Sequence, residues 1–328
     1  MHCNIQKPTY SRILPILLVC LSGNVYAAIS DYCETTFVDG ATAHGNGKIE
    51  IGNSPTIYNN PDGLLAASNE KEIERLNCDG FGACQISNTP TEPLNLGDFI
   101  ESANDENDVD VDSSSVTIGE NSGPYKGNNF GTINVNNGGT LTFRGEYSQY
   151  LIKEINVLEN GNNATLNLTP GDYYIEEIET YENTIINIVG SGDVRIFLRD
   201  HSDFEGNTRI NINGNVGQLL IYAYDKIHFK GSTEINGLVY SQDEVEFKDT
   251  TVLNGAASAG DKLKIKDNAN IYYNCGASEP TPNQCSAVFP DGASTHSVGG
   301  TINFGYNSQL FGSDDNQLAT TAINKNSG

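Results

Sequence analysis

The chain reads DKIHFKGSTEINGLVYSQ at 225–242, DEVEFKDTTVLNGAASAG at 243–260 and DKLKIKDNANIYYNCGAS at 261–278, and these three lines align without a gap. Apolar side chains recur in three columns, which are Ile227, Val245 and Leu263; Phe229, Phe247 and Ile265; and Ile235, Leu253 and Ile271. Such a period keeps the same side chains facing inward when a β-chain coils about an axis. One turn cannot bury its apolar face alone, so successive turns must stack. The repeat predicts an all-β, single-stranded parallel β-helix with about eighteen residues per turn in its regular part.

Short β-like segments that alternate apolar and polar residues precede this repeat, from Thr132 onward. Turn dipeptides such as Asn-Gly, Gly-Gly and Pro-Gly separate them, as expected for strands with one buried and one wet face. Similar segments at Glu182 and Gly206 lie 24 residues apart, so the earlier turns are longer than eighteen residues. We expect a right-handed coil, because crossovers between parallel strands strongly favour that hand.

The first 27 residues have the pattern of a secretion signal. Lys7 and Arg12 provide a positive start, Ile13–Leu21 is apolar, and Val25–Ala27 ends in small residues. The apolar run is too short to span a bilayer comfortably, so we expect cleavage and no membrane span afterwards. The formal net charge is −24, and loss of two positive residues with the signal makes it −26. A chain this acidic repels nucleic acid, which excludes it as a partner.

Five cysteines remain after the signal, and an exported protein is expected to use them in disulfides. Cys78 and Cys84 are close enough in sequence to close a small loop. Cys33 and Cys275 flank the solenoid region, and their pairing would require its ends to meet. Cys285 then has no partner within this chain. Zinc is the competing explanation, but no C-x-x-C pair is present and the histidines are scattered, so we expect no metal site.

A second, longer repeat sets the domain boundaries. Residues 33–65 and 285–318 align with one gap, and both contain a Cys-x-x-x-Phe-x-Asp-Gly-Ala-x-x-His opening. We therefore predict a signal peptide at 1–27 and a β-helical module at 28–278, with an irregular N-terminal part. A Pro-containing linker at 279–284 and the truncated start of a second module at 285–328 would follow. The second copy has too few turns to bury a core of its own.

The repeated opening carries two candidate polar pairs, Asp39 with His44 and Asp291 with His296. An Asp–His pair can bind a metal or act as acid and base. The structural interpretation is that Asp-Gly forms a turn and the histidine hydrogen-bonds to a neighbouring turn. We favour the structural interpretation, because both copies would need it in order to fold alike.

Two acidic patterns are also interpreted as structural. DENDVDVD at 105–112 lacks the glycine of an EF-hand loop, so we read it as part of a solvated loop over 101–131, with weak divalent cation binding as the alternative. Asp225, Asp243 and Asp261 open the three aligned lines and would form a ladder at one corner. We expect each to start its turn through an Asx hydrogen bond.

No catalytic pattern stands out. The chain has 18 basic residues and no nucleophile elbow, P-loop or dinucleotide fingerprint, so neither catalysis nor a cofactor is expected. Some β-helices are polysaccharide lyases or hydrolases, which need clustered carboxylates in a cleft. The sixteen tyrosines, among them Tyr272, provide either internal stacks or exposed rings that bind sugars or proteins.

The signal, the opening motif seen twice and the solenoid pattern together resemble the MshQ-like proteins encoded with the mannose-sensitive haemagglutinin (MSHA) type IV pilus. The regular turns at 225–274 are also similar to bactofilins, which implies a triangular right-handed coil. Members of the MshQ-like family are usually longer than this chain. The resemblance implies no catalytic residues.

These observations predict an exported, non-enzymatic β-solenoid scaffold in the periplasm, on the outer surface or secreted. The resemblance implies a role in type IV pilus biogenesis or cell-surface adhesion. Its expected partners are pilus or envelope proteins or surface glycans. The alternatives are a carbohydrate-acting β-helix enzyme and a non-catalytic glycan-binding adhesin.

Overall fold

The computed structural model describes residues 28–53, 55–60, 63–67, 76–87, 91–102, 107–158, 163–275, 301–304 and 322–325. The signal expected at 1–27, the linker at 279–284, Cys285, Asp291 and His296 lie outside these residues. Of the second copy, only strands β26 (Thr301–Phe304) and β27 (Ala322–Lys325) are described, and they pair in parallel. Within the described ranges, no helix has the length and apolarity needed to cross a membrane.

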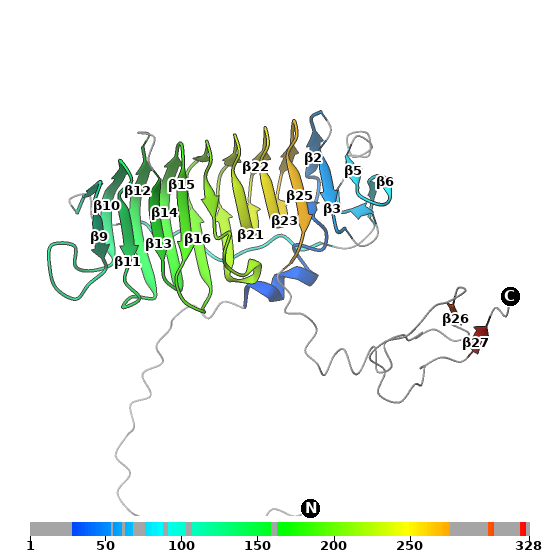
Figure 1. Cartoon of the computed structure of the whole chain (residues 1–328), viewed down its shortest axis with the longest axis horizontal. Coiled ribbons are helices and arrows are strands. Elements are labelled where there is room, and N and C mark those ends of the chain that lie inside the picture. Colours follow the sequence, from blue (N-terminus) through cyan, green and yellow to red (C-terminus); the bar gives the residue numbers. More distant parts are fainter. Residues whose placement is uncertain are drawn as a thin grey trace, which may run out of the picture.

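The expected all-β class is confirmed, because strands dominate the described residues and the helical elements among them are two short 3-10 turns, η1 (Ile29–Glu34) and η2 (Val216–Gln218). One sheet holds 23 strands, and each long strand pairs with the strands one turn before and one turn after it. Figure 1 shows these strands side by side along the long axis of the molecule. Nearly all the pairs are parallel; β5 (Asn77–Cys78) and β6 (Gly82–Ala83) at one end are antiparallel. The handedness expected from the sequence stays a prediction.

Three ladders of strands form three faces. The charged face comprises β8 (Val109–Asp112), β17 (Ser202–Phe204), β20 (Ile227–Phe229), β22 (Glu244–Phe247), β24 (Lys262–Ile265), β2 (Lys48–Ile51) and the C-terminal halves of β10 (Asn129–Asn136), β12 (Gln149–Val157) and β14 (Gly171–Thr180). The polar face comprises β9 (Ser115–Ile118), β11 (Thr140–Phe143), β13 (Ala164–Leu168), β15 (Thr184–Ile188), β18 (Arg209–Ile210), the N-terminal halves of β21 (Glu234–Ser241) and β23 (Val252–Ala259), β25 (Asn270–Tyr273), β3 (Thr56–Tyr58) and β5.

The covered face comprises the N-terminal halves of β10, β12 and β14, then β16 (Val194–Leu198), β19 (Leu219–Ala223), the C-terminal halves of β21 and β23, and β1 (Ala41–Ala43). The remaining strands, β4 (Leu64–Leu65) and β7 (Gln85–Ile86), pair in parallel in a small sheet of their own.

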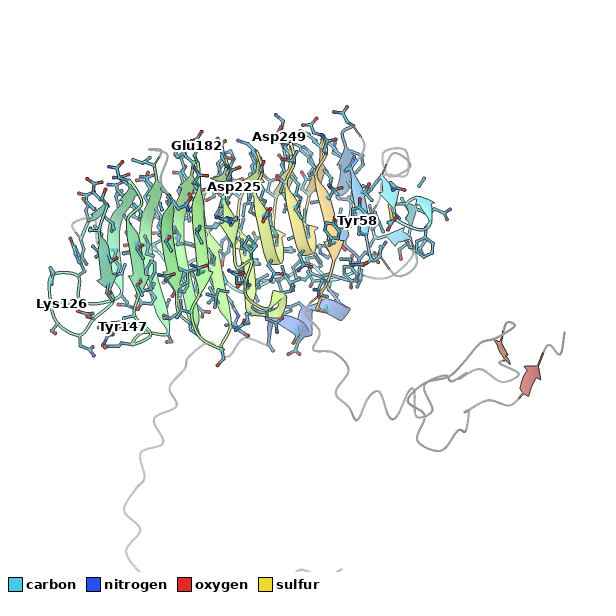
Figure 2. All side chains as sticks on the ribbon, viewed as in Figure 1. Tyr58, Lys126, Tyr147, Glu182, Asp225 and Asp249 are labelled. Atoms are coloured by element: carbon cyan, nitrogen blue, oxygen red, sulfur yellow. A yellow bond between two sulfur atoms is a disulfide. The ribbon has the colours of Figure 1, made fainter. Side chains whose placement is uncertain are left out.

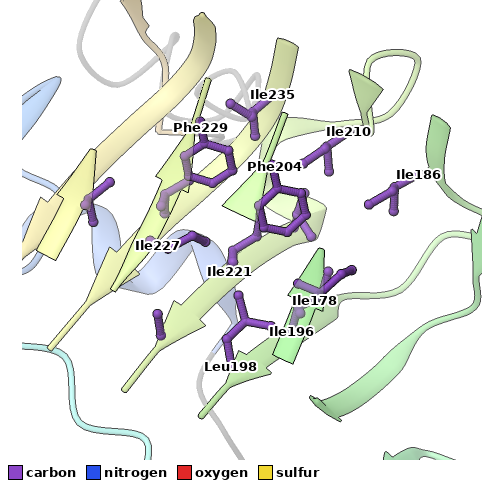
Figure 3. Packing of buried hydrophobic residues seen from close by; sticks show 14 of the residues in the cluster. Ile178, Ile186, Ile196, Leu198, Phe204, Ile210, Ile221, Ile227, Phe229 and Ile235 are labelled. Carbon is purple, nitrogen blue, oxygen red and sulfur yellow. The ribbon is translucent and has the colours of Figure 1, made fainter. Parts of the chain in front are cut away.

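The apolar columns read from the sequence are confirmed. Ile227 aligns with Val245 and Val245 with Leu263, and the other two columns stack in the same way. All of these side chains are buried in one continuous core. Figure 3 shows this core at the first regular turn and the turns before it, where Phe204 and Phe229 lie in the same interior. Their rings are stacked with centroids 5.1 Å apart. Burial of stacked apolar side chains in this way supplies most of the favourable free energy of folding.

The order of the turns in space differs from their order in the chain. Strands β1, β2 and β3 near the N-terminus pair with β23, β24 and β25, so the N-terminal turn is laid on the last C-terminal turn. It continues the columns with Ile49 on Leu263, Ile51 on Ile265 and Ile57 on Ile271. In Figure 1 the blue strands β2 and β3 therefore lie beside the orange β25. This arrangement covers the sheet edge that β25 would otherwise expose to further strands.

A second apolar cluster lies outside the covered face. Tyr222 and Leu238 point outward there, yet both are buried, because the extended segment 91–102 and helix η1 lie against them. The Tyr222 hydroxyl donates to the Leu94 carbonyl at 3.2 Å, and Tyr224 donates to that of Gly97 at 2.9 Å. On the other two faces, most outward side chains of the described strands are partly or fully exposed.

The region 101–131 differs from the expected loop, because β8 and β9 lie within it as the first turn of the coil. Val109 and Val111 point into the core, and the acids between and after them face solvent. The alternation of valine with aspartate in the DVDVD segment is thus a strand pattern with a period of two. The high acid content makes this segment resemble a solvated loop, and the prediction of a loop is wrong for β8 and β9.

Candidate functional site

The two expected cysteine pairs are joined in the structure. Cys33 and Cys275 form a disulfide with a Cα–Cα distance of 5.6 Å, and Cys78 and Cys84 form another at 5.0 Å. The long-range bridge is possible because the N-terminal turn packs on the C-terminal turn. Both bridges lie near the end of the coil where the N-terminal turn packs on the C-terminal turn. Their role there is structural.

Asp39 and His44 do not converge on a shared ligand. The Asp39 carboxylate accepts a hydrogen bond from the Ala66 backbone at 3.0 Å. The His44 Nε2 atom lies 2.6 Å from the Ser258 hydroxyl on the neighbouring turn. His44 is buried, and burial lowers its pKa to about 4. Its ring is therefore neutral at physiological pH, in agreement with the structural interpretation of the motif.

The aspartates at the start of each regular turn lie at one corner of the coil. The backbone amides of Asp261 and Lys262 both donate to the Asp243 carbonyl. Burial, followed by the neighbouring Asp225 and Asp261 carboxylates, raises the pKa of Asp243 against the opposing charge of Lys226. These contacts bind successive turns to one another and leave no converging ligand set at this corner among the described residues.

The polar face displays two columns of outward side chains in register. The first column is Ser115, Thr140, Thr165, Ile185, Arg209, Glu234, Val252, Asn270 and Thr56. The second contains Thr117, Thr142, Asn167 and Asn187 at one end and Asn236, Asn254, Tyr272 and Tyr58 at the other. Parallel strands are about 4.8 Å apart, and alternate residues on one strand are about 6.6 Å apart. The face is therefore a regular grid of mostly uncharged hydrogen-bonding groups.

Side chains of the second column hydrogen-bond to one another along the coil axis. Asn167 donates to the Thr142 hydroxyl at 3.1 Å, and Asn187 donates to the Asn167 amide oxygen at 3.2 Å. Asn254 donates to the Asn236 amide oxygen at 2.8 Å. These bonds hold the amides in fixed orientations. Asn236 is buried and donates to the Asn211 and Gly214 carbonyls, so the partly exposed Asn167, Asn187 and Asn254 are the amides that the face offers to a ligand.

An aromatic pair ends this column. The rings of Tyr58 and Tyr272 are stacked, with centroids 4.5 Å apart and planes 9° from parallel. The Tyr272 side chain is 38% exposed, and Figure 2 shows Tyr58 on the outside of the sheet. An exposed aromatic surface beside fixed amides is the combination that binds the apolar face and the hydroxyls of a sugar ring.

Ion pairs link the acidic and basic side chains of the charged face. Lys264 Nζ lies 2.6 Å from Glu244 Oε1, and Lys266 Nζ lies 2.9 Å from Glu246 Oε2. Burial by itself would raise the pKa of both glutamates, but the hydrogen bonds from these lysines lower it. Carboxylates held in this ionised state are poor general acids.

Sequence reasoning missed the polar face and one cluster on the charged face. Nothing in the sequence distinguishes Tyr272 from the other tyrosines. Its partner Tyr58 belongs to the N-terminal turn, which is distant in the sequence, so the pair could not be predicted. The histidines, which looked scattered, include two that meet: His201 Nε2 lies 3.0 Å from His228 Nδ1. The turn length in this region could have predicted the pair. A turn of about 25 residues places His228 beside Asp203, and His201 lies two residues before Asp203.

The comparisons with known proteins assign no activity to this chain. Residues 148–268 match the model of a domain of unknown function, DUF8470. No curated protein matches the chain. A glycosylated ice-binding protein from an Arctic yeast is 9% identical, with a TM-score of 0.34 over 79% of this chain and 96% of that one. The DUF3494 domain of an ice-binding protein from Shewanella frigidimarina is 12% identical, with a TM-score of 0.33 over 76% and 99%.

Proposed function

We propose that this protein is an exported, non-enzymatic parallel β-helix that binds a surface glycan through its polar face as part of an adhesion system. The observation that carries the proposal is the stacked Tyr58–Tyr272 pair at the end of a fixed amide column. Sugars bind by stacking on aromatic rings and by hydrogen bonds to groups such as asparagine. A role beside a type IV pilus, suggested by the MshQ-like opening motif, is the cellular setting that we propose for this binding.

Replacement of the aromatic pair tests the glycan proposal. We expect Tyr58→Ala and Tyr272→Ala each to weaken binding to the best ligand on a glycan array by about tenfold or more, as loss of a central aromatic contact does. Tyr181→Ala is the matched control, because this partly exposed tyrosine contacts Glu179 on the charged face. Circular dichroism establishes that each variant is folded. Equal binding by wild type and both polar-face variants would contradict the proposal.

The enzyme alternative has one supporting feature. Burial, and then the nearby Glu179 and Glu154 carboxylates, raise the pKa of Glu177 on the charged face. A carboxyl group with a raised pKa beside other carboxylates is suited to general acid catalysis. Turnover of a polysaccharide that disappears in Glu177→Gln would replace the non-enzymatic proposal with a hydrolase or lyase.

The hydroxyl-rich end of the polar face favours ice as a second candidate ligand. Ser115, Thr117, Thr140, Thr142 and Thr165 form a two-column grid on three adjacent strands. A flat array of hydroxyls at the fixed spacing of a parallel sheet can hold water in an ordered layer. This candidate uses the opposite end of the face from the tyrosine pair, so the two ligands can be tested separately.

If ice is the ligand, the folded protein should be enriched in slowly growing ice, and Thr142→Lys should reduce that enrichment to the level of a non-binding protein. The lysine would place a charge and a long side chain in the centre of the grid. Glu154→Lys, on the charged face, is the control and should leave enrichment unchanged. Enrichment that survives Thr142→Lys, or none by wild type, would exclude ice binding by this grid.

A further inference from the structure

Two successive turns of the charged face bring three metal-binding atoms together. His201 immediately precedes β17, Asp203 lies on β17, and His228 lies on β20, where it aligns with Asp203. The His201 Nε2 and His228 Nδ1 atoms are 3.0 Å apart. Asp203 Oδ1 lies 3.4 Å from the first nitrogen and 3.3 Å from the second. The three atoms form a nearly equilateral triangle.

These separations match the edges of a coordination polyhedron. An ion about 2.0–2.1 Å from each ligand has ligand atoms about 3.3 Å apart in tetrahedral geometry and about 3.0 Å apart in octahedral geometry. Two imidazole nitrogens and one carboxylate oxygen are a ligand set used by divalent first-row transition metals. The distances therefore need little adjustment for an ion to be held.

Asp203 Oδ1 is the most enclosed oxygen of the proposed ligand set. It is buried and accepts no well-aligned hydrogen bond from the described residues. Lys230 Nζ lies 3.1 Å from it.

His228 has the support that metal-binding histidines usually have. Its second nitrogen, Nε2, lies 3.2 Å from Glu244 Oε1, and the Glu244 side chain is only 5% exposed. Donation of the Nε2 proton to this carboxylate leaves a lone pair on Nδ1, directed to the triangle. Lys264 holds Glu244 in turn at 2.6 Å. Coordination by Nδ1 requires the tautomer that carries its proton on Nε2, and the Glu244 carboxylate beside Nε2 favours that tautomer.

We propose that His201, Asp203 and His228 bind one divalent transition-metal ion, of the Zn²⁺ class, which links two successive turns of the coil. The His201 side chain is 45% exposed, so the outer side of the ion remains open to water or to an oxygen donor. Glu244 is a positioning residue for His228. Lys230 competes with the ion for Asp203. This site is separate from the polar face and does not depend on the proposed glycan function.

Titration of the chelator-treated full chain with Zn²⁺ in a calorimeter tests the site. We expect one ion per chain and a fall in affinity of at least about a hundredfold in His228→Ala and in His201→Ala. Glu244→Gln keeps all three ligands and should lose about tenfold to a hundredfold, as changes to the partners of metal ligands do. Because His201 is largely exposed, its replacement tests the site without disturbing the core.

Lys230→Met distinguishes a metal site from a simple ion-pair cluster. Loss of the competing ammonium should tighten Zn²⁺ binding several-fold, whereas a cluster without a metal role would show no binding to enhance. Glu179→Gln, one turn before Asp203 and outside the three proposed ligands, is the matched control and should bind as wild type does. Absence of stoichiometric Zn²⁺ binding by wild type, or equal affinity in His201→Ala and wild type, would overturn the proposal.

Discussion

Replacement of both Cys33 and Cys275 by serine is expected to lower the free energy of unfolding by about 5 kcal/mol. The bridge closes a loop of 242 residues, and loop-closure entropy in the unfolded chain grows with the logarithm of loop length. The bridge also anchors the N-terminal turn that covers the edge of β25. For a protein of this size, the loss corresponds to a fall in Tm of roughly 10–20 °C. Urea unfolding and calorimetry of the oxidised proteins measure it.

The short bridge is the control for this expectation. Cys78 and Cys84 close a loop of only 6 residues, so their double serine variant should lose about 2 kcal/mol. Equal losses from the two variants would show that loop closure across the whole coil is not what stabilises it. Limited proteolysis of the Cys33/Cys275 variant should also cut near residues 41–58 first, because this turn would then be held by non-covalent contacts alone.

Stability should fall by about 3 kcal/mol between pH 7 and pH 4 because of His44 alone. Burial lowers its pKa to about 4 in the folded protein, against an ordinary value of 6.5. Between these two values the unfolded chain binds a proton that the folded protein does not, so acid favours unfolding. The contribution is complete above about pH 6.5 and is lost as the pH falls to about 4. Urea unfolding over this range measures the slope.

His44→Gln should remove this part of the pH dependence, whatever it does to stability at pH 7. Ser258→Ala is the matched control, because it removes the hydrogen-bond partner of His44 but leaves the imidazole buried. Ser258→Ala should therefore retain the wild-type slope. The interpretation is wrong if His44→Gln and wild type lose stability in parallel as the pH is lowered.

The eighteen-residue period was sufficient to predict which side chains stack. Ile227, Val245 and Leu263 share an apolar column because each turn of constant length returns the chain to the same position. The prediction of a loop at the DVDVD segment is wrong, because its apolar–polar alternation is short and its outward residues are all acids. The alternation of apolar and polar residues predicts which face of a strand is buried. The prediction is weak where only two apolar residues lie on that face.

The all-β class and the inward columns could be predicted from the amino-acid sequence, because both follow from a local pattern repeated at a fixed interval. The position of residues 41–58 as the turn after 257–273 is seen in the folded structure alone, because strand pairing between distant segments leaves no period in the sequence. That placement brings Tyr58 onto Tyr272 and Cys33 to Cys275. The His201–His228 contact likewise depends on turn length, which varies outside the regular repeat and is set by how each loop packs.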